Sequence, residues 1–226
     1  VFSNCSSLMI ITMLEGVTSI GPSAFLGCSL ASITIPDNVN IIGDYAFESC
    51  GNLSSIKIPC NVGEIGVFIF EDCSNLSNIE VAAGNSVYHA SENCLIETQS
   101  KTLIAGCKNS TIPADGSVTS IGHGAFSGCS NLTDIVIPVN VTNIQDYAFY
   151  NCGLKSIAIP AGVEKIGKYT FYSCKDLTSI VVSENIISIE NHALGYCLSL
   201  NNITYNGTKV QWEAISKGTD WDVSAG

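Results

Sequence analysis

A phrase of about 23 residues recurs along most of this chain, and it constrains the fold more than any other feature. Residues 42–59 and 121–138 both follow the pattern Ile-Gly-x-x-Ala-Phe-x-x-Cys-x-x-Leu-x-x-Ile-x-Ile-Pro. Self-similarity at such a period is typical of solenoids, in which each repeat forms one coil. A single coil cannot bury its own apolar face, so its stability comes from contacts with its neighbours.

The cysteines mark the repeat and locate its interruption. Eight of the eleven occupy one position of the pattern: Cys5, Cys28, Cys50, Cys73, Cys129, Cys152, Cys174 and Cys197. The steps between them are nearly equal, except that the step from Cys73 to Cys129 is more than twice as long as any other. This long step predicts an insertion at about residues 82–116. We expect an expanded turn, with a hairpin at residues 95–98 and 102–105, that leaves the core continuous.

Apolar positions recur in register, so they should form ladders through the stacked coils, about 4.8 Å apart if the coils pair as parallel strands. The aromatic ladder is Phe25, Phe47, Phe70, Phe126, Phe149 and Phe171, ending in Leu194. The isoleucine ladder is Ile33, Ile56, Ile79, Ile135, Ile157, Ile180 and Ile203. These ladders predict one apolar core along the whole chain.

Each repeat also contains local signals. Residues 53–58 alternate apolar and polar side chains, which predicts a strand that ends at Pro59. Ala46, Phe47 and Cys50 have helical spacing, which predicts a short helix on the outer side. The expected fold is α/β: a right-handed leucine-rich-repeat solenoid of about eight 22–23-residue turns, with parallel strands and short helical segments.

The whole chain, residues 1–226, is expected to form one solenoid domain. After Ile203 the repeat breaks down, and a cap is predicted at about residues 204–226. Terminal repeats must shield the open core from water, so Trp212 and Trp221 are interpreted as cap residues, with a binding role as the alternative.

The repeated thiols are expected to be reduced and buried, because free cysteine packs as a small hydrophobe and the number of cysteines is odd. Cys60 follows the strand-ending proline at a predicted exposed turn, and it is the expected reactive thiol. Cys94 and Cys107 flank the predicted hairpin. Two buried thiols are favoured there over a cross-strand disulfide, and both alternatives stay open from the sequence.

Charge and hydropathy exclude some classes of function. The net charge is −11 with only nine basic residues, spread along the chain. Binding to nucleic acid requires a basic surface that neutralises phosphates, and binding to an anionic membrane surface is disfavoured for the same reason. No apolar stretch approaches the roughly 18 residues that a membrane span needs, so no direct membrane insertion is expected. The chain starts at Val1, halfway through a repeat and without a visible signal peptide, so we expect a piece of a longer protein with its targeting signal upstream.

The full pattern, in about seven copies, resembles the repeat of BspA-like leucine-rich-repeat surface proteins. The phrase at residues 102–107 and the tail around Trp212 and Trp221 are similar to that family as well. The resemblance implies an extracellular or cell-surface location in microbes that live on host mucosa. It also implies adhesion to host matrix proteins, host cells or other microbes. The family has no defined catalytic residues to transfer.

A search for catalytic or metal-binding chemistry gives no candidate, and no enzyme, cofactor or metal is predicted. His89, His123 and His192 are the only histidines. His123 fills a position interpreted as ordinary and exposed, and His192 aligns with a row of tyrosines and is expected to pack there. A cysteine–histidine pair needs the two side chains within hydrogen-bond reach, and the expected burial of the thiols disfavours it. No zinc, P-loop or EF-hand motif occurs.

Binding is therefore the leading functional hypothesis, with a protein or glycan on a host or microbial surface as the partner. Outward-facing strand positions form small polar rows, and the candidate ligand-facing residues are Ser55, Lys57, Asn78, Glu80, Asp134, Ser156, Ser179 and Asn202. A second possible patch contains Tyr45, Tyr147, Tyr150, Tyr169 and Tyr172, for which packing between turns is the favoured interpretation. The alternative to a binding module is a structural spacer or stalk without its own ligand.

Overall fold

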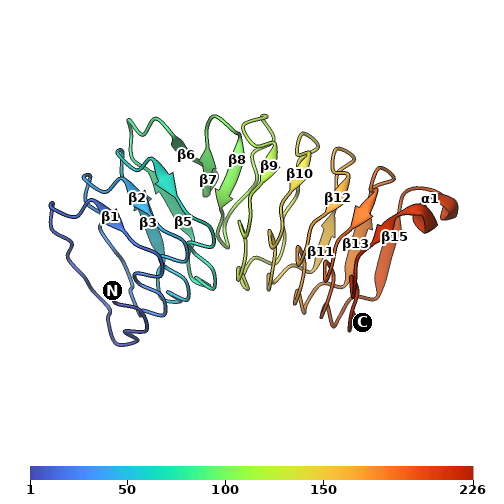
Figure 1. The fold of residues 1–226 in the computed structure, drawn as a ribbon, viewed down its shortest axis with the longest axis horizontal. Helices are drawn as coiled ribbons and strands as arrows, with labels where there is room; N and C mark the ends of the chain where they lie inside the picture. Colours follow the sequence, from blue (N-terminus) through green and yellow to red (C-terminus); the bar gives the residue numbers. More distant parts are fainter. Residues whose placement is uncertain (226) are drawn as a thin grey trace.

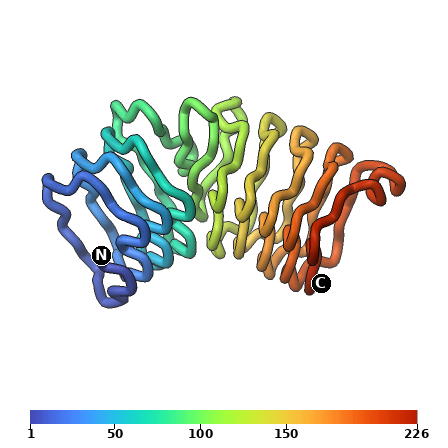
Figure 2. The backbone as a smooth tube through the Cα atoms, in the orientation of Figure 1, coloured from blue at the N-terminus to red at the C-terminus, as the bar shows by residue number. Residues whose placement is uncertain are grey.

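The chain forms a stack of about eight coils, seen in a computed structural model that describes residues 1–225. The coils follow one another along the long axis, with the two termini at opposite ends (Figure 1). The stack is bent. The coils spread apart along the upper edge of the view, where β6, β7 and β8 lie, and come together along the lower edge (Figure 2).

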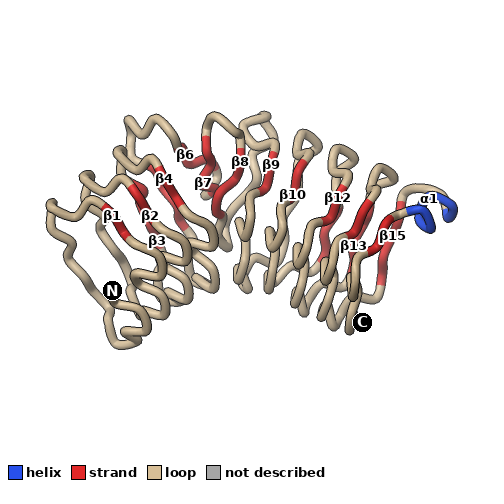
Figure 3. Tube along the Cα trace, viewed as in Figure 1, coloured by secondary structure: helices blue, strands red, loops and turns tan. Residues whose placement is uncertain are grey.

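Regular coils carry up to two short strands, and these strands form two sets of sheets (Figure 3). The first set contains β1 (Ser19–Ile20), β2 (Ile41–Ile42), β4 (Glu64–Ile65), β6 (Tyr88–Ser91), β7 (Cys94–Glu97), β8 (Thr102–Ala105), β9 (Ser120–Ile121), β10 (Asn143–Ile144), β12 (Lys165–Ile166), β14 (Ser188–Ile189) and β16 (Ser216–Lys217). The second contains β3 (Ser55–Ile58), β5 (Asn78–Val81), β11 (Ser156–Ala158), β13 (Ser179–Val182) and β15 (Asn202–Tyr205).

Neighbouring coils pair in parallel, and the register confirms part of the predicted isoleucine ladder on each side of the insertion. Ile56 pairs with Ile79 across β3 and β5, and Ile180 pairs with Ile157 and Ile203 across β11, β13 and β15. The phenylalanine rings also stack from coil to coil. The Phe126, Phe149 and Phe171 centroids are 5.2 and 5.4 Å apart with almost parallel planes. The right-handed sense of winding stays a prediction.

The short helix predicted in each repeat is wrong. Within residues 1–225 the one helix is α1 (Lys209–Ala214), in the terminal segment. In a typical coil, Tyr45 and Ser49 both have φ of 57°, in the left-handed region, and a right-handed helix cannot pass through such residues. The backbone N–H of Phe47 donates to Ile69 of the next coil, whereas that of Cys50 donates to Phe47 in its own turn. Bonds between coils alternate with turn bonds, so the segment is a chain of turns.

The repeated cysteines lie in these turns. They are buried, except Cys5 in the first coil, which is exposed. Each buried thiol between Cys28 and Cys73 donates to the phenylalanine carbonyl of the preceding coil, as Cys50 does to Phe25 at 3.1 Å. Cys174 and Cys197 repeat this contact at 3.0 Å. A small apolar side chain with one weak donor therefore fits this position. Cys94 and Cys107 are buried free thiols, and Cys60 is half-buried.

The insertion is a layer of the stack, and not the expanded turn that the sequence predicts. Strands β6, β7 and β8 pair antiparallel, and β8 pairs in parallel with β9, so that Leu103 lies opposite Ile121. The buried residues form two clusters, which corrects the prediction of one continuous core. The clusters meet at β7, where Cys94 and Ile96 belong to the C-terminal cluster and Leu95 belongs to the N-terminal one.

The last coil is covered by aromatic residues. Trp212 from α1 and Trp221 are partly buried against the C-terminal cluster, with their ring centroids 6.2 Å apart. Tyr205 packs on Trp212 at 5.3 Å, and the Lys217 ammonium lies 4.7 Å from the Trp212 ring centre. The role of the two tryptophans as cap residues stays a prediction. The outer boundaries of the domain stay a prediction.

Thiol reactivity provides a test of this packing. Burial raises the pKa of Cys50, Cys94 and Cys197 to about 12, so these thiols are protonated as well as inaccessible at pH 8. We expect a soluble disulfide reagent to modify two thiols quickly in the native protein, Cys5 and Cys60. The other nine (11 − 2) should react only after unfolding. A Cys60→Ala variant should lower the fast count to one, and rapid modification of four or more thiols would contradict the buried row.

Candidate functional site: an aromatic groove on the inner edge

The predicted ligand-facing positions occupy the outer side of the second set of strands, in two separate groups. In the N-terminal group Ser55 pairs with Asn78 and Lys57 pairs with Glu80, and the Asn78 amide donates to the Glu80 carboxylate at 2.9 Å. The second group contains Ser156, Ser179 and Asn202, which align across β11, β13 and β15. All seven side chains are exposed or half-buried.

Asp134 is exposed but belongs to neither group. Residues 134–137 lie between β5 and β11 and form no strand, although their sequence matches the strand pattern. Val136 is 75% exposed beside Asp134. The predicted row is therefore interrupted where the insertion enters the stack, and it does not form one continuous polar surface.

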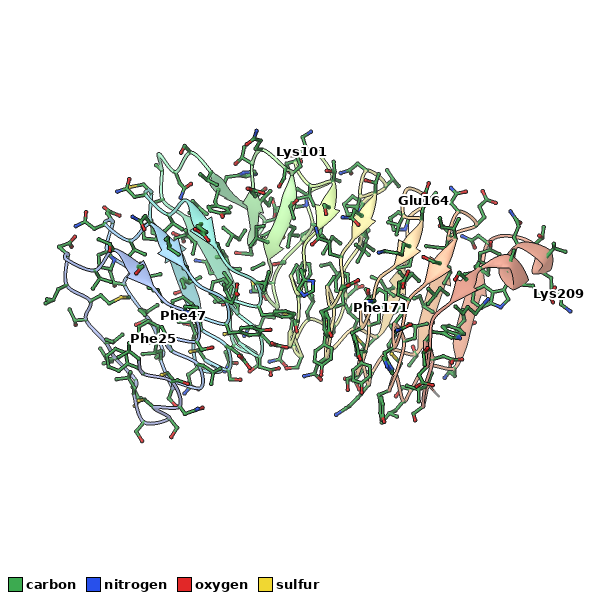
Figure 4. All side chains as sticks on the ribbon, viewed as in Figure 1. Phe25, Phe47, Lys101, Glu164, Phe171 and Lys209 are labelled. Carbon is green, nitrogen blue, oxygen red and sulfur yellow. The ribbon has the colours of Figure 1, made fainter. Side chains whose placement is uncertain are left out.

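The inner, lower edge of the stack carries two rows of side chains from the turns. The first row consists of residues that lie two positions before the ladder phenylalanines or Leu194, from the coil of Phe47 onward: Tyr45, Phe68, Gly124, Tyr147, Tyr169 and His192. The second row consists of the residue after each ladder phenylalanine from Phe47 onward: Glu48, Glu71, Ser127, Tyr150 and Tyr172. Figure 4 labels Phe47 and Phe171, which precede members of the second row, in the lower part of the stack, with Glu164 on the upper edge.

The first row is stacked from coil to coil. Tyr45 lies on Phe68 with centroids 5.1 Å apart, Tyr147 lies on Tyr169 at 4.8 Å, and Tyr169 lies on His192 at 4.8 Å. The packing of His192 in this row confirms the prediction. The rows also touch each other, since the ring centroids of Tyr147 and Tyr150 are 5.8 Å apart.

The inner edge runs directly from the coil before the insertion to the coil after it. Phe68 meets His123 at 5.0 Å and Tyr147 at 5.8 Å, both edge to face. A Cβ at Gly124 would lie 2.4 Å from the Phe68 ring, so this ring takes the space of the missing side chain. His123 is half-buried among the rings, and its interpretation as an ordinary exposed position is wrong.

These rows enclose a shallow groove of about 570 Å³, the aromatic groove, lined by Tyr45, Phe68, Glu71, His123, Tyr147, Tyr150, Tyr169 and Tyr172. The sequence identified five of these residues as a patch and favoured packing as their role. Packing does account for the stacked faces. The same side chains are only half-buried, however, so they also present surface to a ligand. The sequence did not identify three further members of the groove, namely Phe68, Glu71 and His123. Their neighbours in the groove come from the other side of the insertion.

Carboxylates lie at the N-terminal side of the groove. Ser127, which is buried, donates to the Glu71 carboxylate at 2.7 Å across the two sides of the insertion. The Asn151 amide donates to Asp72 at 3.4 Å. Burial raises the pKa of Glu71 above its usual 4.5, the Ser127 hydrogen bond opposes this change, and the charges of Asp72 and Glu48 add to it. The pKa values of Glu48 and Asp72 are raised too, again mainly by burial.

Neutralising Glu71 should therefore stabilise the fold at neutral pH. A carboxyl with a raised pKa in the folded state favours folding at low pH, and this contribution is lost as the pH rises above 4.5 through the raised value. We expect Glu71→Gln to have a higher Tm than the wild type at pH 7, with the difference vanishing near about pH 3. Thermal unfolding followed by circular dichroism measures this. The exposed Glu164→Gln is the charge-matched control, and equal shifts in both variants would contradict the local cause.

Other kinds of site are not formed by the part of the chain that the structure describes. No group of three or more histidine, cysteine, aspartate or glutamate side chains among residues 1–225 is arranged to hold a metal ion. Over the same residues, no helix has both the length and the apolar character required to cross a membrane.

The coils, the parallel ladders and the sequence period together define a leucine-rich-repeat solenoid. The repeat profile described as the BspA type leucine rich repeat region matches in six copies, over residues 1–115 and 100–217. The chain belongs to the BspA-type leucine-rich-repeat family. Among curated proteins no sequence matches it significantly.

Solved structures of bacterial proteins are similar to this chain. A leucine rich cell surface protein from Faecalibacterium prausnitzii is 32% identical over 95% of this chain, with a TM-score of 0.73. The match covers 64% of that protein, so this chain spans less than two thirds of its length. A leucine-rich repeat protein from Eubacterium ventriosum is 22% identical, with 96% and 71% of the two chains covered and a TM-score of 0.75. The pneumococcal vaccine antigen PcpA is 18% identical, with 86% and 61% covered and a TM-score of 0.59. The last two show likeness of fold alone.

Proposed function

We propose that this chain is a binding module, secreted or displayed at the cell surface, that mediates adhesion to a host matrix protein, a host cell or another microbe. The family and the cell-surface protein from Faecalibacterium prausnitzii support the location. Leucine-rich-repeat solenoids typically act as scaffolds for protein interaction rather than as enzymes.

The aromatic groove is the observation that carries this proposal. It gathers five tyrosines, one phenylalanine and one histidine, together with Glu71, into one hollow on the inner edge. Tyrosine is enriched at protein interfaces, because its ring contributes apolar contact area while its hydroxyl stays hydrated. The strand-face residues Lys57 and Glu80 and their neighbours are a second proposed contact surface.

Binding measurements with immobilised chain test the proposal. Soluble matrix proteins, a glycan panel and suspended bacterial cells are applied to the wild type, to Tyr150→Leu and to a Lys57→Ala/Glu80→Ala double variant. We expect at least one ligand to bind the wild type and to lose affinity with Tyr150→Leu. Loss with the double variant alone would place binding on the strand face. If nothing binds at high micromolar concentration, the proposal fails and the structural spacer takes its place.

A further inference from the structure

The second row of the inner edge changes its chemistry halfway along the stack. Glu48 and Glu71 occupy it before the insertion, and Tyr150 and Tyr172 occupy it after the insertion. Ser127 lies between them and holds the Glu71 carboxylate through its hydroxyl. An acidic segment of this row therefore adjoins an aromatic segment, and Glu71, Tyr150 and Tyr172 line the groove.

The stacking of the second row ends at Tyr150, at this junction. Tyr150 stacks on Tyr172 with centroids 5.5 Å apart and planes only 2° from parallel. On its other side the row continues with Ser127, which has no ring, and then with Glu71. The charges of Glu71 and Asp72 are close enough to add to the raised pKa of Tyr150, after burial and Tyr172. Tyr150 and the Glu71 carboxylate therefore face one groove.

The carboxylates have no positive partner among the residues that the structure describes. The one salt bridge among residues 1–225 joins Lys209 to Glu213, in α1 at the far end of the stack. Lys168 precedes Tyr169 of the groove, but it is exposed and forms no salt bridge with Glu71. Clustered like charges that are partly removed from water are unfavourable by themselves, and a bound cation would relieve both the repulsion and the desolvation.

We propose that the aromatic groove binds a lysine or arginine side chain of a basic polypeptide, with the cation between the Tyr150 ring and the Glu71 carboxylate. Cations are attracted to the faces of tyrosine rings and to carboxylates, so both walls favour the same ligand charge. The opposite charge is repelled by Glu48, Glu71 and Asp72. This inference rests on the proposed binding function, and it specifies the chemistry of the partner.

The length of the groove favours a polypeptide over a free amine. Its lining residues come from five successive coils on the inner edge, from that of Tyr45 to that of Tyr169. Four steps of roughly 4.8 Å give about 19 Å, the length of about six residues of extended chain. A segment of this length can place one basic side chain at Glu71 while its backbone follows the tyrosine rows.

An eight-residue peptide of alternating lysine and glycine is the probe, and tyrosine fluorescence or calorimetry reports its binding. We expect Glu71→Gln and Tyr150→Leu each to weaken binding about fivefold or more, and Tyr150→Phe, which keeps the ring, to stay within about twofold of the wild type. Glu164→Gln removes the same charge at the opposite edge and should also stay within about twofold. A glutamate–glycine peptide should not bind.

Three results would overturn the inference. Equal losses in Glu71→Gln and Glu164→Gln would mean that the peptide responds only to net charge. If a neutral oligosaccharide binds the wild type and loses affinity with Tyr150→Leu, while the basic peptide does not bind, the groove has a sugar ligand instead. If a panel ligand that loses affinity with Tyr150→Leu is not displaced by excess basic peptide, the adhesion proposal stands and the cationic ligand is wrong. The thermal unfolding of Glu71→Gln, measured as above, shows whether its loss of binding arises from unfolding.

Discussion

Replacing Phe149 by alanine should lower the free energy of unfolding by about 3–5 kcal/mol, the largest effect that we expect from a single substitution. Phe149 is fully buried, and its ring lies between those of Phe126 and Phe171 at 5.2 and 5.4 Å. Alanine at this position leaves a cavity between two rings whose coils are fixed by hydrogen bonds on both sides, such as that from Phe126 N–H to the Ala148 carbonyl. The surroundings cannot collapse into the cavity without breaking those bonds.

Urea denaturation followed by circular dichroism measures this loss. Val139→Ala is the matched control, because Val139 is 87% exposed and its truncation should change the free energy of unfolding by less than about 0.5 kcal/mol. Phe149→Leu, which retains much of the volume, should fall between the two. A loss below about 1 kcal/mol for Phe149→Ala would show that the aromatic ladder does not sustain the stack.

The second large effect is expected at Gly66, where two coils approach each other closely. A Cβ at this position would lie 2.4 Å from the backbone nitrogen of Asp44 and 2.8 Å from its Cα. The contact is with backbone, so a rotamer change cannot relieve it. The neighbouring N–H of Val67 also donates to the Asp44 carboxylate at 2.8 Å, which holds the two coils at this separation. Gly66→Ala should therefore destabilise the protein by about 1–3 kcal/mol.

Gly63→Ala is the control for this effect. Gly63 lies in the same coil, and no atom lies within 4 Å of the place that a Cβ would take there. The substitution should be neutral or stabilising by up to about 1 kcal/mol, because alanine restricts the unfolded chain more than glycine does. Equal losses of stability in the two variants would show that the close approach at Gly66 is not the cause.

The regular part of the fold could be predicted from the sequence because the same apolar and polar pattern recurs in each repeat. Period, apolar ladders and buried thiols all depend on contacts between equivalent positions, so the recurrence of Ile56 and Ile79 already implies their pairing. The helical prediction failed because spacing alone was used for Ala46 and Phe47. Side-chain spacing does not report the left-handed φ of Tyr45 and Ser49, which directs alternate N–H groups to the next coil.

The aromatic groove could be predicted only in part. The tyrosine rows follow from the repeat, and the sequence identified them. The contacts of Glu71 with Ser127 and of Phe68 with His123 join residues that lie on opposite sides of the insertion, more than two repeats apart in the sequence. Aligning the repeats does not reveal the structure of the insertion. It therefore cannot show that the coils on either side of the insertion are in contact along the inner edge. The unpaired segment at Asp134 was missed for the same reason.

The three antiparallel strands β6, β7 and β8 have one consequence for how this architecture can vary. Coils of uniform length would extend the stack along a regular path, whereas the inserted layer widens one rim and leaves the other rim in contact. The position of the inserted layer in the sequence determines which turns of the N-terminal half contact turns of the C-terminal half. A single insertion or deletion event can thus create a new pairing of surface side chains while every regular repeat keeps its sequence.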